Sequence, residues 1–370
     1  MTDTRPTRWF QRFLLPGFAF KAVVIGGGYA TGRELVEFFM PSGPRGGLWA
    51  MALATLIWSL VAALTFAFSY HVKAFDYRHF FKELLGPFAV IFDISYSLLV
   101  ILLLSVFGAA AGSITNTMFA WPSWVGTAIL AISIAGFVTF GNAAIEKLFK
   151  YVSFLLYGVY ALFLLISLSS FGDRILAGFS LPATSSGWAI GGITYASYNI
   201  VGAVVVLPVL RHLTSTRDAM IAGVVAGPLA MAPAILFFVA MIGFYPAIQS
   251  EALPSDFILT QMRFPAFHML FQAMIFSALL ESGAGAVHAV NERIASLRRG
   301  VMGRAARATT ALVILAFCMF VADRFGLVFL IAKGYRVLAA IFLFIYVMPL
   351  LTIGVFRLWR PLPEAEQRLA

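Results

Sequence analysis

Apolar residues occur in ten runs of about 20 residues, separated by short polar segments. The runs cover residues 13–40, 47–70, 88–115, 123–141, 148–170, 188–211, 218–245, 265–290, 308–322 and 327–356. When they form helices, runs of this length match the thickness of the hydrocarbon core of a bilayer. The pattern therefore predicts an all-α integral membrane protein with ten transmembrane helices.

The amino-acid composition supports this interpretation. Of the 370 residues, 61% are hydrophobic and 11% are charged, and the mean hydropathy is +0.92. A soluble domain needs a larger polar surface than this composition supplies. Cys318 is the only cysteine, which excludes an intramolecular disulfide framework.

The basic residues are distributed unevenly between the predicted loops. With the N-terminus in the cytoplasm, 18 of the 26 Lys and Arg residues fall in cytoplasmic segments and four fall in outer ones. This bias predicts cytoplasmic tails at residues 1–12 and 359–370 of a multi-pass protein in the cell membrane. The net charge of +10 is then explained by topology and contact with lipid, and not by nucleic-acid binding.

Two of the ten runs are interrupted, about half a chain apart. The first contains Gly26, Gly27 and Gly28, and the sixth contains Tyr195, Ser197, Tyr198 and Asn199. Each half of the chain holds five spans, an odd number, so residues 188–358 enter the membrane in the opposite orientation to residues 13–170. Residues 171–187 connect the two halves on the extracytoplasmic side. Paired broken helices in an inverted repeat are typical of secondary transporters.

The string VIGGGYATG at residues 24–32 is open to other interpretations. It is similar to a dinucleotide-binding fingerprint, but another apolar run follows it at 47–70 in place of a soluble βαβ unit. Gly28 and Gly32 also have the small-xxx-small spacing of helix packing faces. The matching polar interruption in the sixth run favours a third interpretation, in which the glycines break the helix and free backbone groups for a solute or an ion.

Three strings carry a resemblance to a known family. They are GGGYATGRELVEFF at 26–39, YASYNIVGAVVVLP at 195–208 and ALLESGAG at 278–285. The whole chain resembles the YkvI-type membrane proteins of the amino acid–polyamine–organocation superfamily. The resemblance implies the LeuT-type five-plus-five fold, with helices 1 and 6 broken at mid-membrane and lining the site, and it implies no particular substrate. Lys21 departs from the pattern of the family. Span eight lacks the clear Ser/Thr pair that sodium symporters of this fold use to bind Na⁺.

The broken segments supply the candidate substrate-binding residues. These are Gly26, Gly27, Gly28, Tyr29, Thr31, Tyr195, Ser197, Tyr198 and Asn199. The glycine backbone and the polar aromatic cluster offer donors, acceptors and ring faces to a small zwitterion or amine. The structural alternative is that these side chains only satisfy unwound backbone.

Ionisable residues inside apolar spans are costly, so each is a candidate for function. Glu281, in the middle of span eight, is the candidate ion-coupling residue, as a carrier of H⁺, a ligand of Na⁺ or the partner of Lys21 in a buried ion pair. The rest of the predicted ion-coupling site consists of Ile25, Ser277, Ser282 and Lys21.

Arg33 and Glu34 follow the first interruption and are the predicted gating residues. Neighbouring residues on a helix point about 100° apart. We therefore expect Arg33 and Glu34 to bind different partners. Glu37, one turn further on, is expected to face solvent.

The pattern as a whole predicts an ion-coupled secondary transporter that moves a small polar organic solute, an amino acid or an amine, by alternating access. We expect no cofactor, resident metal, nucleic-acid partner or enzyme activity, since the sequence has no P-loop, HExxH motif or nucleophile elbow. The expected partners are the solute and the lipid bilayer, and a monomer is sufficient. The alternative is a non-transporting membrane sensor or assembly partner with the same fold. An intramembrane enzyme using Glu281 and His288 would lack a nucleophile.

Overall fold

The computed structural model describes residues 9–140, 142–182, 185–297 and 303–359, and within these ranges the chain is helical and has no strand. The helices that fall in the apolar runs of the first half are α1 (Trp9–Phe13), α2 (Leu15–Val24), α3 (Gly27–Ala30), α4 (Arg33–Phe38), α5 (Gly43–His71), α7 (Ala89–Phe119), α8 (Ser123–Phe140) and α9 (Asn142–Ser170). Those of the second half are α11 (Trp188–Asn199), α12 (Gly202–Val205), α13 (Thr216–Ile242), α15 (Pro265–Leu297), α16 (Arg304–Phe329), α17 (Tyr335–Phe342) and α18 (Val355–Leu358). Helices occupy each of the ten apolar runs, and several extend beyond the predicted ends.

Helix length bears on the number of membrane crossings. Within the described ranges six helical segments are long and apolar enough to cross a membrane, or seven if Leu155–Ser170 and α10 (Gly172–Ser180), bent by 71°, are one span. One of the six, Arg304–Leu358, has 55 residues and is kinked at Gly326, where φ is +73°. The structure is therefore that of a multi-pass membrane protein, whereas the count of ten crossings stays a prediction.

Three short helices lie in segments that the sequence analysis treated as connections. They are α6 (Tyr77–Leu85), α10 and α14 (Pro254–Met262). A search for long apolar runs does not detect them because each has only nine residues. α6 begins with a clear capping signal, since the Asp76 side chain accepts a hydrogen bond from the backbone N–H of His79 at 3.0 Å.

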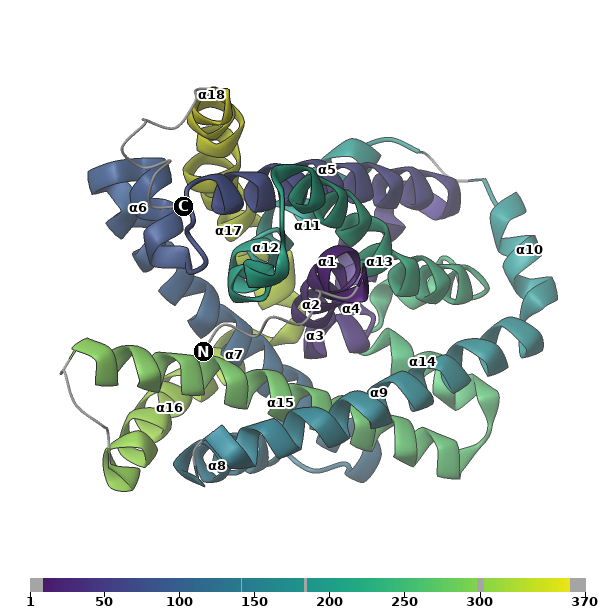
Figure 1. Cartoon of the computed structure of the whole chain (residues 1–370). Helices are drawn as coiled ribbons and strands as arrows, with labels where there is room; N and C mark the ends of the chain where they lie inside the picture. The colour runs from purple at the N-terminus through teal and green to yellow at the C-terminus, as the bar shows by residue number, and fades with distance from the viewer. Residues whose placement is uncertain (1–8, 141, 183–184, 298–302, 360–370) are drawn as a thin grey trace, which may run out of the picture.

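The interrupted helices lie in the middle of the bundle. In Figure 1 the purple segments α1 to α4 and the teal α12 are central, with α5 on one side and α9 and α15 on the other. α2 packs against α12 and α13, while α3 packs against α7 and α15. Residues at the interruptions therefore face helices from both halves of the chain.

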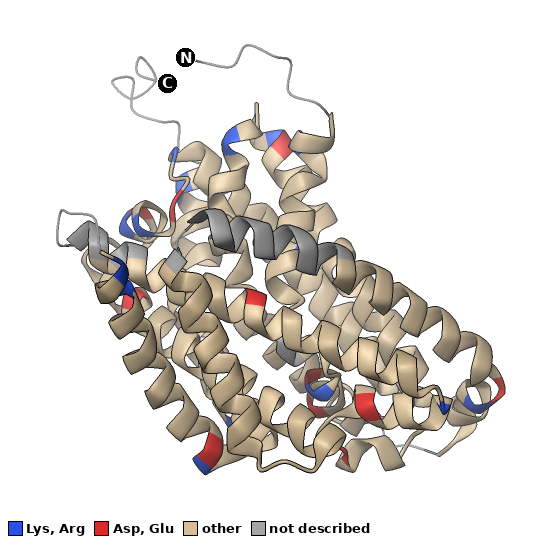
Figure 2. Cartoon of the chain, turned by 90° about the horizontal axis from the view of Figure 1, so that it is seen from below, with Lys and Arg blue, Asp and Glu red and all other residues tan. Residues whose placement is uncertain are grey.

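Charged side chains gather toward the two ends of the helices and are sparse between them (Figure 2). This distribution fits a chain whose middle zone contacts hydrocarbon. The described chain begins and ends on the same side of the helical body (Figure 2). α6 and α18 are joined by Arg357, which donates to the Glu83 carboxylate at 3.2 Å.

Candidate functional site

The first apolar run is divided into separate helical pieces. α2 ends at Val24 and α3 begins at Gly27, so Ile25 and Gly26 lie between them. α4 begins after Gly32, whose φ of +80° favours glycine. A Cβ atom at Gly32 would also lie 2.9 Å from the Phe237 ring. Both the backbone angle and the space at this point therefore require glycine.

The second interruption is tighter than the first. α11 ends at Asn199 and α12 begins at Gly202. Between them the backbone makes a 3₁₀-type turn, since Ala203 N–H donates to the Ile200 carbonyl at 2.9 Å. The sixth run is thus locally overwound at this point, and not extended.

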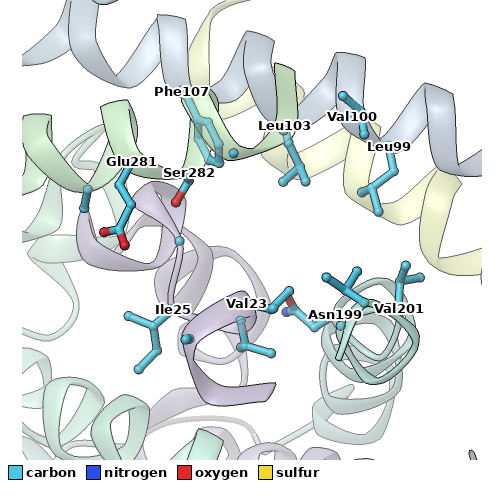
Figure 3. A pocket seen from close by; sticks show the side chains of 18 of the residues that line it. Val23, Ile25, Leu99, Val100, Leu103, Phe107, Asn199, Val201, Glu281 and Ser282 are labelled. Atoms are coloured by element: carbon cyan, nitrogen blue, oxygen red, sulfur yellow. The ribbon is translucent and has the colours of Figure 1, made fainter. Parts of the chain in front are cut away.

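A cavity of about 450 Å³ lies where these two interruptions meet α7 and α15. Its walls include Val23, Ile25, Leu99, Val100, Leu103, Phe107, Asn199, Val201, Glu281 and Ser282 (Figure 3). Glu281 and Ser282 come from α15 and lie beside the purple segment between α2 and α3 (Figure 3). A cavity of this volume matches the size of small-molecule sites.

The cavity brings together about half of the residues singled out in the sequence. Those that line it are Ile25, Gly26, Glu34, Tyr198, Asn199, Glu281 and Ser282. Those that do not are Lys21, Tyr29, Thr31, Arg33, Tyr195, Ser197 and Ser277. Gly27 and Gly28 belong to α3, and their surroundings lie outside the described part of the structure.

Two of the predicted serines bond within their own helices, as the Asn199 amide also does with the Tyr195 carbonyl at 3.2 Å. The Ser197 hydroxyl donates to the Ile193 carbonyl at 2.7 Å, and the Ser277 hydroxyl donates to the Ala273 carbonyl at 2.8 Å. Such i−4 bonds are a common way to satisfy a hydroxyl in a helix. For these two residues the geometry supports the structural alternative to a binding role.

Glu34 is buried, with 5% of its surface exposed, and it reaches the cavity from α4. Its Oε2 atom accepts a hydrogen bond from the Tyr198 hydroxyl at 2.7 Å. This bond connects the helix after the first interruption to the last turn before the second. Glu34 is therefore part of the cavity wall, at the end where the two halves of the chain meet.

Arg33 and Glu34 bind different partners, as their adjacent positions on the helix predicted. The Arg33 guanidinium donates to the Gln249 and Glu251 carbonyls at 3.1 and 2.9 Å and to Glu37 Oε2 at 2.9 Å. Arg336 of α17 donates to the other oxygen of Glu37, also at 2.9 Å. The expectation that Glu37 faces solvent was wrong, because two arginines hold it. We call Arg33, Glu37 and Arg336 the charged clasp.

Two residues of the charged clasp, Arg33 and Glu37, lie on α4, the helix that carries Glu34 of the cavity wall. Besides Arg33 and Arg336, the backbone of α14 docks there, since Ser255 N–H donates to the Thr31 carbonyl at 3.0 Å. A second cavity of about 540 Å³ shares Tyr96, Val100, Val201, Val205, Ala286 and Ala289 with the first. The second cavity extends to Asp76 and Arg78, next to α6. The two cavities therefore form a path to the side on which α6 lies.

Lys21 does not pair with Glu281 in this structure. Its ammonium group lies over the Tyr157 ring, 4.4 Å from the ring centroid. Among the ion pairs of the described residues, none joins Lys21 to Glu281. A cation over an aromatic face is a stable arrangement for a lysine in a partly apolar setting.

Sequence reasoning missed Tyr335, Tyr157 and the apolar wall from α7. The Tyr335 ring packs on Tyr198 with a centroid distance of 4.4 Å. It lies in the string KGYR between Lys333 and Arg336, and nothing in this string distinguishes the tyrosine as a site residue. The α7 wall carries no polar signal, since Leu99, Leu103 and Phe107 are indistinguishable in sequence from residues that face lipid.

The charged clasp leads to a prediction about access. Arg336→Gln removes one of the two arginines that hold Glu37, and a partly exposed ion pair contributes about 0.2–1 kcal/mol, so the open state should gain about 1.4- to fivefold in population. The measurement is the labelling rate of Ser282→Cys, in a Cys318→Ala background, by an impermeant thiol reagent added from the clasp side. Arg357→Gln is the matched control, because it also removes an arginine from an ion pair, with Glu83 of α6, but this pair is not part of the clasp. An unchanged rate for Arg336→Gln, or an equal rise for Arg357→Gln, would contradict the clasp.

Comparisons with known proteins agree with this architecture. The chain is 16% identical to MhsT, solved in complex with L-phenylalanine, with a TM-score of 0.64 over 95% of this chain and 97% of MhsT. It is 13% identical to the Eremococcus coleocola manganese transporter, solved with an aromatic bis-isothiourea compound, with a TM-score of 0.57 over 91% and 77% of the two chains. The chain has the LeuT fold. At these identities the likeness shows the fold alone, and the expectation that the chain is not an enzyme stays a prediction.

Sequence comparisons are less specific than the fold. No family model matches the chain. It is 26% identical over 208 residues to the uncharacterized protein YyaD of Bacillus subtilis, a match that covers 55% of this chain and 58% of YyaD. The match thus spans less than two thirds of the length of that relative. Membership of this LeuT-fold chain in the YkvI-type group stays a prediction.

Proposed function

We propose that this chain is an ion-coupled secondary transporter with ten membrane spans, arranged as a five-plus-five inverted repeat. The observation that carries the proposal is the cavity at the two interruptions, which contains the carboxyl groups of Glu34 and Glu281. Acidic side chains at membrane depth are costly and mark solute or ion pathways. The short pieces α1 to α4 together make one broken span, as do α11 and α12.

The accessibility of the cavity fits one state of an alternating-access cycle. We infer that the charged clasp closes it, and it continues through the second cavity toward α6. If the positive-inside bias gives the orientation, α6 is cytoplasmic and the state is inward-facing. Opening the clasp and closing the path beside α6 would expose the same site to the other side.

Glu281 is the proposed coupling residue. It lies on the cavity wall with Ser282, Gly26 and Ile25, next to the first interruption (Figure 3). A carboxyl group in this position can carry a proton, or bind Na⁺ together with backbone carbonyls of the broken helix. The coupling ion is thus H⁺ or Na⁺, and no cofactor is needed.

The proposed cargo is a small polar organic solute, an amino acid or an amine. Tyr198, Asn199 and Glu34 supply a hydroxyl, an amide and a carboxyl group to a cavity whose other walls are mostly apolar. Such a cavity suits a solute with one polar end and an apolar body. The protein is proposed to act in the cell membrane, with both termini cytoplasmic, and one copy contains the whole site.

The test is uptake into proteoliposomes. Purified protein is first screened by melting temperature against pools of amino acids and amines in Na⁺ and in K⁺ buffer at two pH values, since a ligand of the folded state raises the melting temperature. Hits are then offered as labelled solutes to proteoliposomes with an imposed H⁺ or Na⁺ gradient. Accumulation that collapses with an ionophore supports the proposal. Binding without gradient-driven flux would contradict it and favour the sensor alternative.

A further inference from the structure

Glu34 and Tyr198 line the cavity together, and two further tyrosine rings pack against the Tyr198 ring. Tyr198 packs against Tyr195 at 5.7 Å between centroids and against Tyr335 at 4.4 Å. All three tyrosines lie close enough to the Glu34 carboxylate to interact with its charge. The hydroxyls of Tyr195 and Tyr335 are buried and have no hydrogen-bond partner within the described residues. We call Glu34 with these three tyrosines the aromatic cage.

Glu34 has no counter-ion within the described part of the chain. The neighbouring Arg33 is engaged by Glu37 and by the carbonyls of Gln249 and Glu251. Among the described residues, the only hydrogen bond to the Glu34 carboxylate comes from the neutral Tyr198 hydroxyl. Burying a carboxylate without a cation is unfavourable. A positively charged ligand in the cavity would supply the missing charge.

The rest of the cavity favours the same kind of ligand. Its lining contains the two acidic residues Glu34 and Glu281 and, among the described residues, no Lys, Arg or His. Lys21 is held over the Tyr157 ring and is not itself part of the lining. The remaining wall near the cage is apolar, with Leu99, Leu103 and Phe107. The cavity thus has a negative end and an apolar body.

We propose that the aromatic cage binds the ammonium group of an organic monocation, while the apolar body of that cation lies against the α7 wall. This proposal rests on the proposed function, and it narrows the cargo from an amino acid or amine to an amine without a carboxylate. An ammonium group gains charge-assisted hydrogen bonds from Glu34 and cation–π attraction from the Tyr198 ring, which the rings of Tyr195 and Tyr335 hold in place. The carboxylate of an amino acid would face Glu34 and Glu281 with no basic side chain on the described wall. Glu34 then binds cargo and is not only a gate.

The test compares three ligands that share one ring and chain length. These are 2-phenylethylamine, its neutral isostere 2-phenylethanol and the zwitterion L-phenylalanine. Dissociation constants are measured by calorimetry on the full-length protein in lipid nanodiscs. A hydrogen bond to a charged group changes affinity by about tenfold to hundredfold, so the amine should bind at least about tenfold more tightly than either of the others. Equal or tighter binding of the alcohol or of phenylalanine would overturn the proposal.

A substitution tests whether Glu34 causes the preference for the amine over the alcohol. Glu34→Gln keeps the size of the side chain and loses its charge, so the ratio of amine to alcohol affinity should fall to about one. Glu83→Gln removes an exposed carboxylate of α6 outside both cavities and should leave the ratio unchanged. If Glu34→Gln does not fold, Tyr198→Phe removes the hydrogen bond to Glu34, retains the ring and should change the ratio. Unchanged ratios in Glu34→Gln, or in Tyr198→Phe when it replaces that variant, overturn the proposal.

The outcome is separable from that of the proposed function. Amine-selective binding without gradient-driven flux would contradict the transporter and leave the cage proposal intact. Gradient-driven flux of a zwitterion or a neutral solute, without amine-selective binding, would contradict the cage and leave the transporter intact.

Discussion

Glu281→Gln is expected to reduce gradient-driven uptake by about 100-fold, because glutamine can neither carry a proton nor offer a negative charge to Na⁺. Glu281 lines the cavity beside Ser282 and the α2–α3 interruption (Figure 3). The substitution is close to isosteric, so the shape of the cavity should persist. Solute exchange in the absence of any ion gradient should therefore stay within about threefold of the wild-type rate.

The pair of assays distinguishes coupling from binding. Loss of uptake together with loss of exchange would show that Glu281 binds the solute or stabilises the fold, and would contradict a pure coupling role. Intact gradient-driven uptake would contradict any coupling role. Glu83→Gln, which removes a carboxylate on the surface of α6, is the control and should keep both activities.

The long helices could be predicted because their signal is local. Each of the ten runs is predominantly apolar, and a helix is found at every one. The short helices α6, α10 and α14 have no such signal, since their sequences mix apolar and polar residues within about two turns. Helical pieces such as α2 are too short to qualify as spans by themselves, so sequence and helix length give different counts of crossings.

Within the candidate site, the sequence identified only those residues whose type is unusual in an apolar run. Glu34 and Glu281 were evident because an acidic residue in an apolar run is rare, and both line the cavity. Tyr195 and Tyr198 looked equivalent in sequence, but only Tyr198 lines the cavity. They are three residues apart on α11, and which of them faces inward depends on how α11 packs on α5 and α17.

The sequence pattern did not predict interaction partners that are far apart in the chain. Adjacency alone showed that Arg33 and Glu34 need different partners, and the structure supplies Glu37 for the first and Tyr198 for the second. The i, i+4 spacing of Arg33 and Glu37 was visible in the sequence. Arg336 was not assignable, because it reaches Glu37 from a helix 299 residues away.

The contact between α5 and α13 shows how the first and second halves are held together. Small residues face each other there, since a Cβ atom at Gly223 of α13 would meet Ala62 and Ala63 of α5, and one at Gly227 would meet Ser59. Ser59 of α5 donates to the Val224 carbonyl at 2.9 Å. Close approach of backbones through small residues is a main source of attraction between helices in a bilayer. This packing makes α5 and α13 one unit.

Gly223→Ala is therefore expected to lower the free energy of unfolding by about 1–3 kcal/mol, the usual cost of overpacking. A Cβ atom at Gly223 would overlap backbone atoms of Ala62 and Ala63, which no side-chain rotation can relieve. The matched control is Gly158→Ala in α9, where nothing lies within 4 Å of the added atom. The control should be neutral or more stable by up to about 1 kcal/mol, because alanine favours the helix. Melting temperatures of both variants in the same detergent check this. Equal melting temperatures for the two variants would show that α5 and α13 can separate without cost, which would contradict their packing as one unit.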